Sequence, residues 1–148
     1  MPTIAKNKRA YFDYNILETI EAGIVLAGYE VKSVKLGHIS LKGAFVTIKD
    51  NEAYLLNADI SPYQPANMPK DYDSARSRKL LLNRREIAHL IGKSKIQGLT
   101  VLPLSMYTKK TKIKVEIAVA KGKKKYEKRE TLKKKESDKE IRKTMKYE

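Results

Sequence analysis

The segment from Ile113 to Ala120, IKVEIAVA, alternates between apolar residues and polar or small ones. Successive side chains of an extended chain point to opposite faces, so this period predicts a strand with one buried and one open face. The apolar run from Leu99 to Tyr107, joined to it by the polar residues 108–112, predicts the neighbouring strand. The chain is therefore expected to build an antiparallel sheet over a core.

Further strand patterns precede this pair. Residues Tyr11 to Ile20 alternate loosely, and residues 23–27 continue the pattern. Ala44 to Ile48 and Ala53 to Leu56 flank Asp50-Asn51, a pair of residues that favours a tight turn, which predicts a hairpin.

Two segments show helix patterns. Asn83 followed by Glu86 is a capping box that precedes apolar residues at helical spacing, and it predicts a helix over about residues 84–91 that stops or loosens at Gly92. A shorter helix is expected over residues 29–36. Residues 60–73 contain three prolines and no period, so they are expected to form a long loop.

These patterns indicate a mainly β fold, an OB-fold-like antiparallel β-barrel with two or three flanking α-helices. Periodicity alone does not separate this barrel from other small barrels. The amino-acid composition changes at Gly122. Residues 121–148 contain thirteen Lys and Arg and six acidic residues, which gives a net charge of +7. We therefore expect a barrel domain over residues 1–120 and a basic C-terminal tail over residues 121–148.

The formal net charge of the whole chain is +15, which points to polyanionic partners, with nucleic acid ahead of an anionic membrane. The chain has no Cys, which excludes a disulfide framework, a thiolate zinc site and cysteine catalysis. No apolar run is long enough for a signal peptide or a membrane span, so a cytoplasmic protein without a membrane partner is expected.

The sequence shows no arrangement of residues that is typical of a catalytic site. His38 and His89 have no companions at metal-ligand spacing, and the glycines do not form a phosphate-binding loop. Glu18 and Glu21 fit surface positions of a strand better than an acid–base pair. The sequence therefore predicts no enzyme, no metal and no cofactor.

Basic clusters lie next to aromatic or apolar residues, a combination that suits RNA with unpaired bases. The clusters are Lys6, Lys8 and Arg9 beside Tyr11, Phe12 and Tyr14; Arg76, Arg78 and Lys79 before three leucines; and Arg84 and Arg85 at the start of the predicted helix. Each cluster alone also fits an ordinary solvated face.

Several motifs follow one another along nearly the whole chain. They are Asn7-Lys8-Arg9-Ala10, Glu21-Ala22-Gly23-Ile24-Val25-Leu26, Gly28-Tyr29-Glu30-Val31-Lys32-Ser33, Leu55-Leu56-Asn57 with Ile60-Ser61-Pro62-Tyr63, Arg78-Lys79-Leu80-Leu81-Leu82, Arg85-Glu86-Ile87 and Ala120-Lys121-Gly122-Lys123-Lys124. Together they resemble the small protein B family, the protein partners of transfer-messenger RNA in bacterial ribosome rescue.

The resemblance implies an OB-like barrel that binds the tRNA-like domain of transfer-messenger RNA. It also implies entry into a stalled ribosome with elongation factor Tu, which is contacted indirectly through the charged RNA. The tail is then expected to be disordered in the free protein, to occupy the empty messenger channel near the decoding centre, and to become helical only on the ribosome. This fits its composition, because its lysines repel one another and its few apolar residues cannot form a core.

The family's RNA-contacting positions match Glu21, Leu81 and Asn83. Plausible neighbours are Asn7, Lys8, Arg9, Tyr14, Lys32 and Lys35, and the ribosome-contacting tail positions are Lys121, Gly122, Lys123, Lys124, Tyr126, Lys128 and Arg129. The chain departs from the family pattern at Tyr11 and Phe12, where basic residues or His are usual, and at Tyr72-Asp73-Ser74.

Each of the three matched positions has a second interpretation. Leu81 also fits an ordinary core residue, and Asn83 fits a helix N-cap with no further role. Glu21 would repel phosphate, so it would either accept from a base amino group or hold a basic neighbour in place. The alternative function for the whole chain is a general ribosomal or RNA-chaperone protein with the same barrel.

Overall fold

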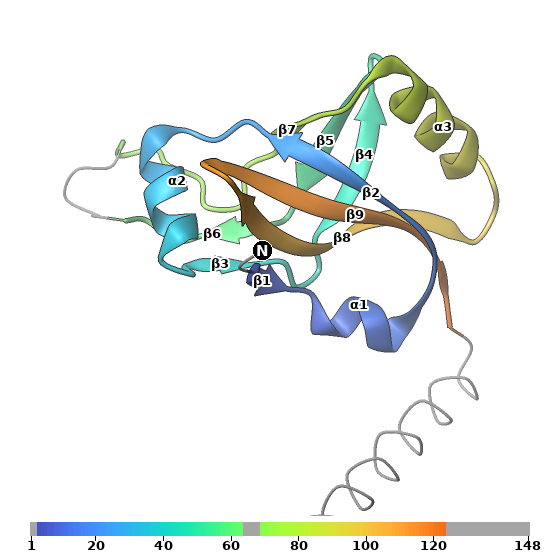
Figure 1. Ribbon diagram of the computed structural model, residues 1–148, viewed down its shortest axis with the longest axis horizontal. Coiled ribbons are helices and arrows are strands. Elements are labelled where there is room, and N and C mark those ends of the chain that lie inside the picture. Colours follow the sequence, from blue (N-terminus) through green and yellow to red (C-terminus); the bar gives the residue numbers. More distant parts are fainter. Residues whose placement is uncertain (1–2, 64–68, 124–148) are drawn as a thin grey trace, which may run out of the picture.

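One antiparallel sheet dominates the computed structural model, which describes residues 3–63 and 69–123 (Figure 1). Its neighbouring strands, in spatial order, are β1 (Thr3–Lys6), β8 (Leu99–Lys109), β9 (Lys112–Gly122), β2 (Tyr14–Ile24), β7 (Arg78–Leu81), β5 (Glu52–Leu56) and β4 (Phe45–Lys49). A separate two-stranded ladder joins β3 (Ile39–Ser40) to β6 (Asp59–Ile60). The expected mainly β, OB-like fold is confirmed.

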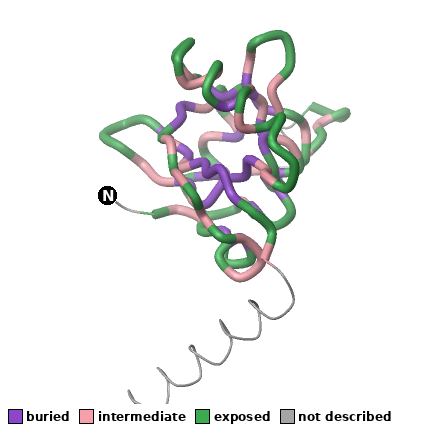
Figure 2. The backbone as a smooth tube through the Cα atoms, turned by 90° about the vertical axis from the view of Figure 1, so that its right-hand side faces the viewer, coloured by how far each residue is buried: buried purple, intermediate pink, exposed green. Residues whose placement is uncertain are grey.

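The sheet curls, so that β4 at one end packs against β8 near the other. The concave side holds the main core, and the buried segments gather inside the curl in Figure 2. The inner residues alternate along each strand as the sequence predicts. They include Leu55, Leu80, Met106, Val115 and Ile117, all 2% exposed or less.

The two predicted hairpins are confirmed. β4 and β5 pair from Phe45 with Leu56 to Lys49 with Glu52, and both turn residues, Asp50 and Asn51, have positive φ. Because Asp and Asn tolerate this left-handed backbone better than other non-glycine residues, they fix the turn and hence the register. β8 and β9 form the longer hairpin, in which each strand has eleven residues.

Helix α1 (Lys8–Asp13) replaces the beginning of the strand that was expected from Tyr11. Asn7 caps it: its side chain accepts from the backbone N–H of Ala10 at 3.3 Å and donates to the carbonyl of Pro103 at 2.9 Å. Ala10 packs on a second apolar cluster on the outer side of the sheet. The strand prediction was wrong here because tertiary packing outweighs the strand preference of Tyr and Phe.

The two predicted helices exist with shifted ends. α2 spans Gly28–Lys35, and α3 spans Arg84–Ser94 and continues through Gly92. The expected end at Gly92 was wrong, because a glycine costs only about 1 kcal/mol inside a helix. Residues 23–27 also do not continue as one strand, since β2 ends at Ile24.

The last strand reaches beyond the boundary drawn from composition. Lys121 pairs with Asn15 and Gly122 pairs with Tyr14, so both belong to the sheet. Lys123 follows, and its backbone N–H donates to the carbonyl of Asp13 at 2.8 Å. The predicted tail positions Lys124, Tyr126, Lys128 and Arg129 lie outside the described residues.

A buried ionic cluster joins α2 to the segment before β7. Glu30 and Arg78 are both fully buried, and Arg78 also donates to the carbonyls of Ala58 at 2.6 Å and Ser74 at 2.9 Å. Arg76 is hydrogen-bonded to the same carboxylate. Tyr72, at one of the departures from the family pattern, donates to the carbonyl of Ile60 at 2.8 Å. Polar contacts therefore fix residues 72–78 to the barrel, and the Tyr72 ring also packs edge-on against Tyr29 of α2, with the ring centres 5.5 Å apart.

Candidate nucleic-acid interface

The outer face of β8, β9 and β2 is open beyond α1 and carries an ordered polar group. Glu21 accepts a hydrogen bond from the Tyr107 hydroxyl on one carboxylate oxygen, and its other oxygen lies 3.3 Å from Lys109 Nζ. The hydrogen bond from Tyr107 lowers the pKa of Glu21, and Lys109 adds to the effect. Glu21 is therefore a fixed, ionised acceptor on an accessible surface.

Leu81 lies opposite Gly23, two residues along β2 from Glu21, and faces outward. Gly23 pairs with Leu81 across β2 and β7, and a Cβ on Gly23 would stand only 3.2 Å from the Cβ of Leu81. The missing side chain of Gly23 thus lets the leucine lie close over the strand. Leu81 is 53% exposed while its neighbour Leu80 is buried, so the interpretation of Leu81 as core is wrong.

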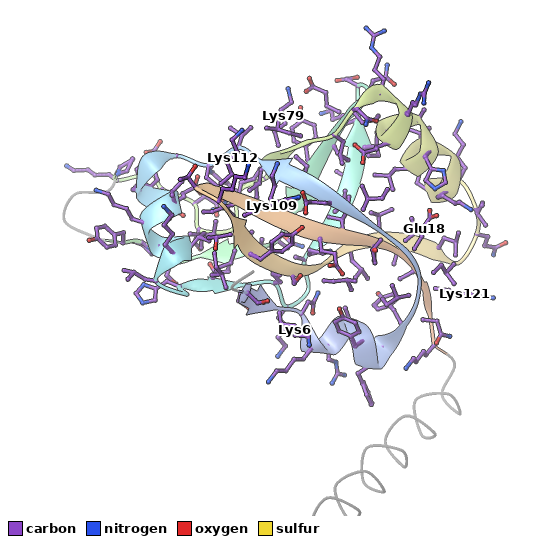
Figure 3. The ribbon with its side chains drawn as sticks, in the orientation of Figure 1. Lys6, Glu18, Lys79, Lys109, Lys112 and Lys121 are labelled. Atoms are coloured by element: carbon purple, nitrogen blue, oxygen red, sulfur yellow. The ribbon has the colours of Figure 1, made fainter. Side chains whose placement is uncertain are left out.

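A hollow of about 310 Å³ extends this surface toward α2. Its floor is apolar and its rim includes two lysines of the β8–β9 hairpin, Lys112 and Lys114. Lys109 and Lys112 point out over this part of the sheet in Figure 3. The lining residues are Gly23, Ile24, Leu26, Val31, Leu81, Thr111, Lys112, Ile113 and Lys114. An apolar surface with cations at its rim suits an unpaired base with its phosphate.

Asn83 follows two residues after Leu81, where the ladder between β7 and β2 has ended. Its side chain accepts from the backbone N–H of Glu86 at 2.8 Å, and the Glu86 carboxylate accepts from the backbone N–H of Asn83 at 3.0 Å. The predicted capping box is confirmed. The helix cap therefore uses the side-chain oxygen of Asn83. Asn83 itself is exposed, so its side-chain NH₂ group can donate to an outside acceptor.

These positions match a known family along the chain. The model of the SmpB protein family matches residues 4–147. The chain belongs to the SmpB family. The SsrA-binding protein of a Sulfurihydrogenibium species is 54% identical over 97% of this chain and 93% of the relative. The SsrA-binding protein of Enterococcus faecalis is 49% identical over 97% of this chain and 92% of the relative.

A solved SmpB structure has the same fold. It is described as "tmRNA-SmpB: a journey to the center of the bacterial ribosome", and it matches with a TM-score of 0.68 at 44% identity. The match covers 81% of this chain and 84% of the other. The OB-like barrel of this chain is therefore the SmpB barrel.

The remaining predicted positions of this SmpB chain lie elsewhere on the barrel. Lys8 and Arg9 are exposed on α1 and line a hollow of about 410 Å³ that Lys6 and Lys42 share. Figure 3 shows Lys6 at the lower edge, well apart from Lys109 and Lys112. The basic residues beside α1 thus form a group of their own, a division for which the sequence motifs gave no reason. Tyr11 of α1 still reaches toward the Glu21 group, because burial and then the charge of Glu116, which pairs with Glu21 on β9, raise the pKa of Tyr11.

Two of the residues near α1 have structural roles. Asn7 is 6% exposed, and its side chain is used by the cap of α1 and by the contact with Pro103. Tyr14 begins β2 and packs against the apolar cluster beneath α1. The rings of the divergent Tyr11 and Phe12 lie 5.6 Å from Lys6 Nζ and 5.2 Å from the Arg9 guanidinium carbon. Both rings therefore hold cations of their own chain.

Lys32 and Lys35 are exposed on α2, beyond the hollow. Lys32 Nζ lies 5.6 Å from the centre of the Tyr63 ring. These two lysines add positive charge to the barrel without contacting the Glu21 group in any described interaction.

The cluster of Arg76, Arg78 and Lys79 is not a free basic surface in this SmpB barrel. Arg78 is buried and Arg76 pairs with Glu30, while Lys79 lies 2.9 Å from Glu52. The expectation that these residues supply phosphate contacts was wrong for Arg78. Alternation offered the signal, since Arg78 shares the inner face of β7 with Leu80.

Four residues at the interface escaped the sequence interpretation: Tyr107, Lys109, Lys112 and Lys114. They come from the two strands of one hairpin, and the polar half of the IKVEIAV alternation was the available signal for Lys114. The pairing of Glu21 with Glu116, and of Gly23 with Lys114, brings them to β2. That pairing joins residues about ninety positions apart, which no local pattern reports.

The histidines have ordinary surroundings. His89 Nε2 lies 2.5 Å from a carboxylate oxygen of Glu18 at the surface, and His38 is exposed after α2. Among the described residues, no group of three or more His, Cys, Asp or Glu is placed to hold a metal ion. None of the helices in residues 3–63 and 69–123 is long and apolar enough to cross a membrane.

Proposed function

We propose that this chain binds the tRNA-like domain of transfer-messenger RNA and brings it to stalled ribosomes, so that the nascent chain is tagged and the ribosome released. The observation that carries the proposal is that the chain belongs to the SmpB family over nearly its whole length. Relatives named SsrA-binding protein are 53% and 54% identical to it. The SmpB barrel matched above comes from a structure of tmRNA-SmpB and the ribosome.

The physical basis is recognition of RNA shape. A folded RNA elbow presents phosphates and a few unpaired bases, and a basic surface with fixed acceptors and apolar contact area can engage both. Glu21, Leu81 and the Lys112–Lys114 rim supply the acceptor, the apolar area and the cations on one side of the sheet. Specificity then comes from the shape of the folded RNA rather than from its base sequence.

The proposal extends to the tail and to further partners. Residues beyond Lys123 occupy the empty messenger channel, and elongation factor Tu contributes through the charged RNA, in the cytoplasm. Two features support the role of the tail: its net charge of +7 over residues 121–148, and the anchoring of Lys123 beside α1. A tail of this charge would gain order in a channel lined by RNA, where phosphates screen the repulsion between its lysines.

Binding to RNA tests the first part. We expect affinity for the tRNA-like RNA to exceed that for a duplex of equal charge by more than about tenfold at moderate salt. Competition with ribosomal RNA fragments separates this function from that of a general RNA chaperone. Equal affinity for all three RNAs would refute the proposal.

Removal of residues 124–148 tests the division of labour. The truncated chain keeps every strand of the barrel and the Lys123 contacts, so its affinity for the tRNA-like RNA should change little. Tagging of nascent chains on stalled ribosomes in a reconstituted system should be lost. If truncation instead abolished RNA binding, the assignment of recognition to the barrel would be wrong.

A further inference from the structure

Helix α1 depends on contacts outside itself. It has only six residues, and a helix this short is unstable in isolation. At its beginning, the Asn7 side chain caps the helix and donates to the carbonyl of Pro103 at 2.9 Å. In its first turn, Ala10 is 3% exposed and packs on apolar residues of β8 and β9. The first half of α1 is therefore held against the sheet.

The other end of α1 is held by the residue from which the tail starts. The last carbonyl groups of a helix have no partner within the helix. The carbonyl of Tyr11 accepts from Lys123 Nζ at 3.2 Å, and the carbonyl of Asp13 accepts from the Lys123 backbone N–H at 2.8 Å. One residue, 112 positions after Tyr11, thus binds both carbonyls.

Lys123 also supplies a charge that this end of α1 lacks. The carbonyl end of a helix carries a partial negative charge, which a nearby cation stabilises. The last turn of α1 contains no basic residue and ends with Asp13. Because the ammonium group of Lys123 donates to a carbonyl of this turn, α1 and Lys123 stabilise each other.

Asn7 and Lys123 are therefore linked through the helix. Without the cap at Asn7, the first turn of α1 would open, and that turn is about half of the helix. The carbonyls that hold Lys123 would then lose their fixed positions. Asn7 is only 6% exposed, so it offers little surface to an outside ligand.

We propose that α1 is a clamp for the tail, and that Asn7 and Lys123 are positioning residues that act through it. The inference rests on the proposed function, in which the barrel and the tail have separate tasks. It adds the part of the barrel that presents residues 124–148 to the ribosome. It also gives Asn7 a role other than the RNA contact that the family resemblance implies.

Hydrogen exchange of the Lys123 amide measures the clamp in the free, full-length protein. In the native chain this N–H is hydrogen-bonded to Asp13 and should exchange slowly. Asn7→Ala should speed its exchange about fivefold, the effect of losing one helix cap. Asn7→Ser keeps a capping oxygen and should retain most of the protection.

Asn83→Ala is the matched control for the exchange measurement. It removes the side-chain cap of α3, which lies away from α1 in Figure 1, at a similar cost in stability. The Lys123 amide should then exchange within about twofold of its native rate. A general loss of barrel stability would instead appear in both variants.

Tagging on stalled ribosomes tests whether the clamp serves the tail. Asn7→Ala and Lys123→Met should both slow tagging, and the double variant should be no slower than the slower single variant, because both act through one helix. Lys125→Met lowers the charge of the tail by the same amount beyond the anchored residue, and it should slow tagging less. Affinity for the tRNA-like RNA should stay within about twofold of the native value in every variant.

Three results would overturn the inference. They are a native exchange rate of the Lys123 amide in Asn7→Ala, equal loss of tagging in Lys123→Met and Lys125→Met, and a fall in RNA affinity that accounts for the loss of tagging. The last result would return Asn7 to the RNA interface.

A reciprocal measurement decides the question if Asn7→Ala does not fold. The Tyr14 backbone N–H donates to the carbonyl of Ala10 at the end of α1. Lys123→Met should speed exchange of this amide, and an unchanged rate would contradict the clamp. All exchange measurements use the free protein, so failure of the proposed function is recognised separately, by equal affinity for the tRNA-like RNA and a duplex.

Discussion

Arg78 donates two hydrogen bonds to the same carboxylate oxygen of Glu30, from Nε at 2.8 Å and from a terminal nitrogen at 2.6 Å, and neither side chain is exposed. Glu30 belongs to α2 and Arg78 to β7, so this pair fixes the helix to the barrel. Ions buried this deeply are tolerated only when paired and hydrogen-bonded.

Glu30→Gln should therefore destabilise the barrel by about 3–5 kcal/mol, because it leaves the Arg78 charge buried without a counter-ion. Urea unfolding followed by circular dichroism measures the change. Glu52→Gln, which breaks a carboxylate–lysine pair at the surface, is the matched control and should leave the urea midpoint nearly unchanged. Equal effects of the two substitutions would contradict the role of the buried pair.

The same pair predicts a pH dependence. Burial alone would raise the pKa of Glu30, but the hydrogen bonds from Arg76, the Ala27 backbone and Arg78 outweigh it and lower the pKa below the ordinary 4.5. The stability contributed by a lowered pKa is complete above the ordinary value and is lost as the pH falls through the lowered one. The difference in urea midpoint between the native chain and Glu30→Gln should shrink below about pH 4.5. A difference that stays constant down to about pH 3 would count against this assignment.

Leu81→Ala should weaken binding of the tRNA-like RNA about tenfold, or about 1.4 kcal/mol, with little effect on folding. The reason is its exposure: Leu81 is 53% exposed and contributes its surface to a ligand rather than to the core. Leu17→Ala is the control, because Leu17 is 56% exposed on the same strand but lies at the irregularity between Ile16 and Glu18, away from Leu81. Filter binding with both variants checks the prediction, and similar losses for the two would mean that Leu81 has no special contact.

Asn83 allows its two roles to be separated by two substitutions. Asn83→Ala removes the cap of α3 and should cost about 1 kcal/mol of stability, whereas Asn83→Ser keeps a capping oxygen and should cost much less. If the amide also contacts RNA, both variants should bind RNA more weakly, including the serine variant that remains stable. Normal RNA affinity in Asn83→Ser would show that the residue serves the helix alone.

Local patterns predicted the elements whose signals are local. The Asp50-Asn51 turn, the alternation around Val115 and the capping box of Asn83 each specify structure within a few residues, and all three are confirmed. α1 was missed because its six residues are held by contacts of Asn7 and Ala10 with β8, far along the chain. Propensity cannot report such contacts.

The candidate site was predicted in part for the same reason. Family motifs supplied Glu21 and Leu81, and the pairing of β2 with β7 brings them close. Tyr107 and Lys109 were missed because only the register of the β8–β9 hairpin carries them to Glu21. Arg78 was assigned to the surface because charge suggested solvent, whereas the partner that permits its burial lies 48 residues earlier.

The contacts of Lys123 fix the point at which the C-terminal tail, residues 124–148, begins. Its backbone N–H and its Nζ bind the carbonyls of Asp13 and Tyr11, so the chain leaves the barrel at a fixed place beside α1. If residues 124–148 bind the ribosome as proposed above, they meet it as a ligand tethered to the RNA-bound barrel, at an effective concentration that this exit point helps to set. Inserting residues after Lys123 would lengthen the tether and change that concentration without altering a single contact of the barrel.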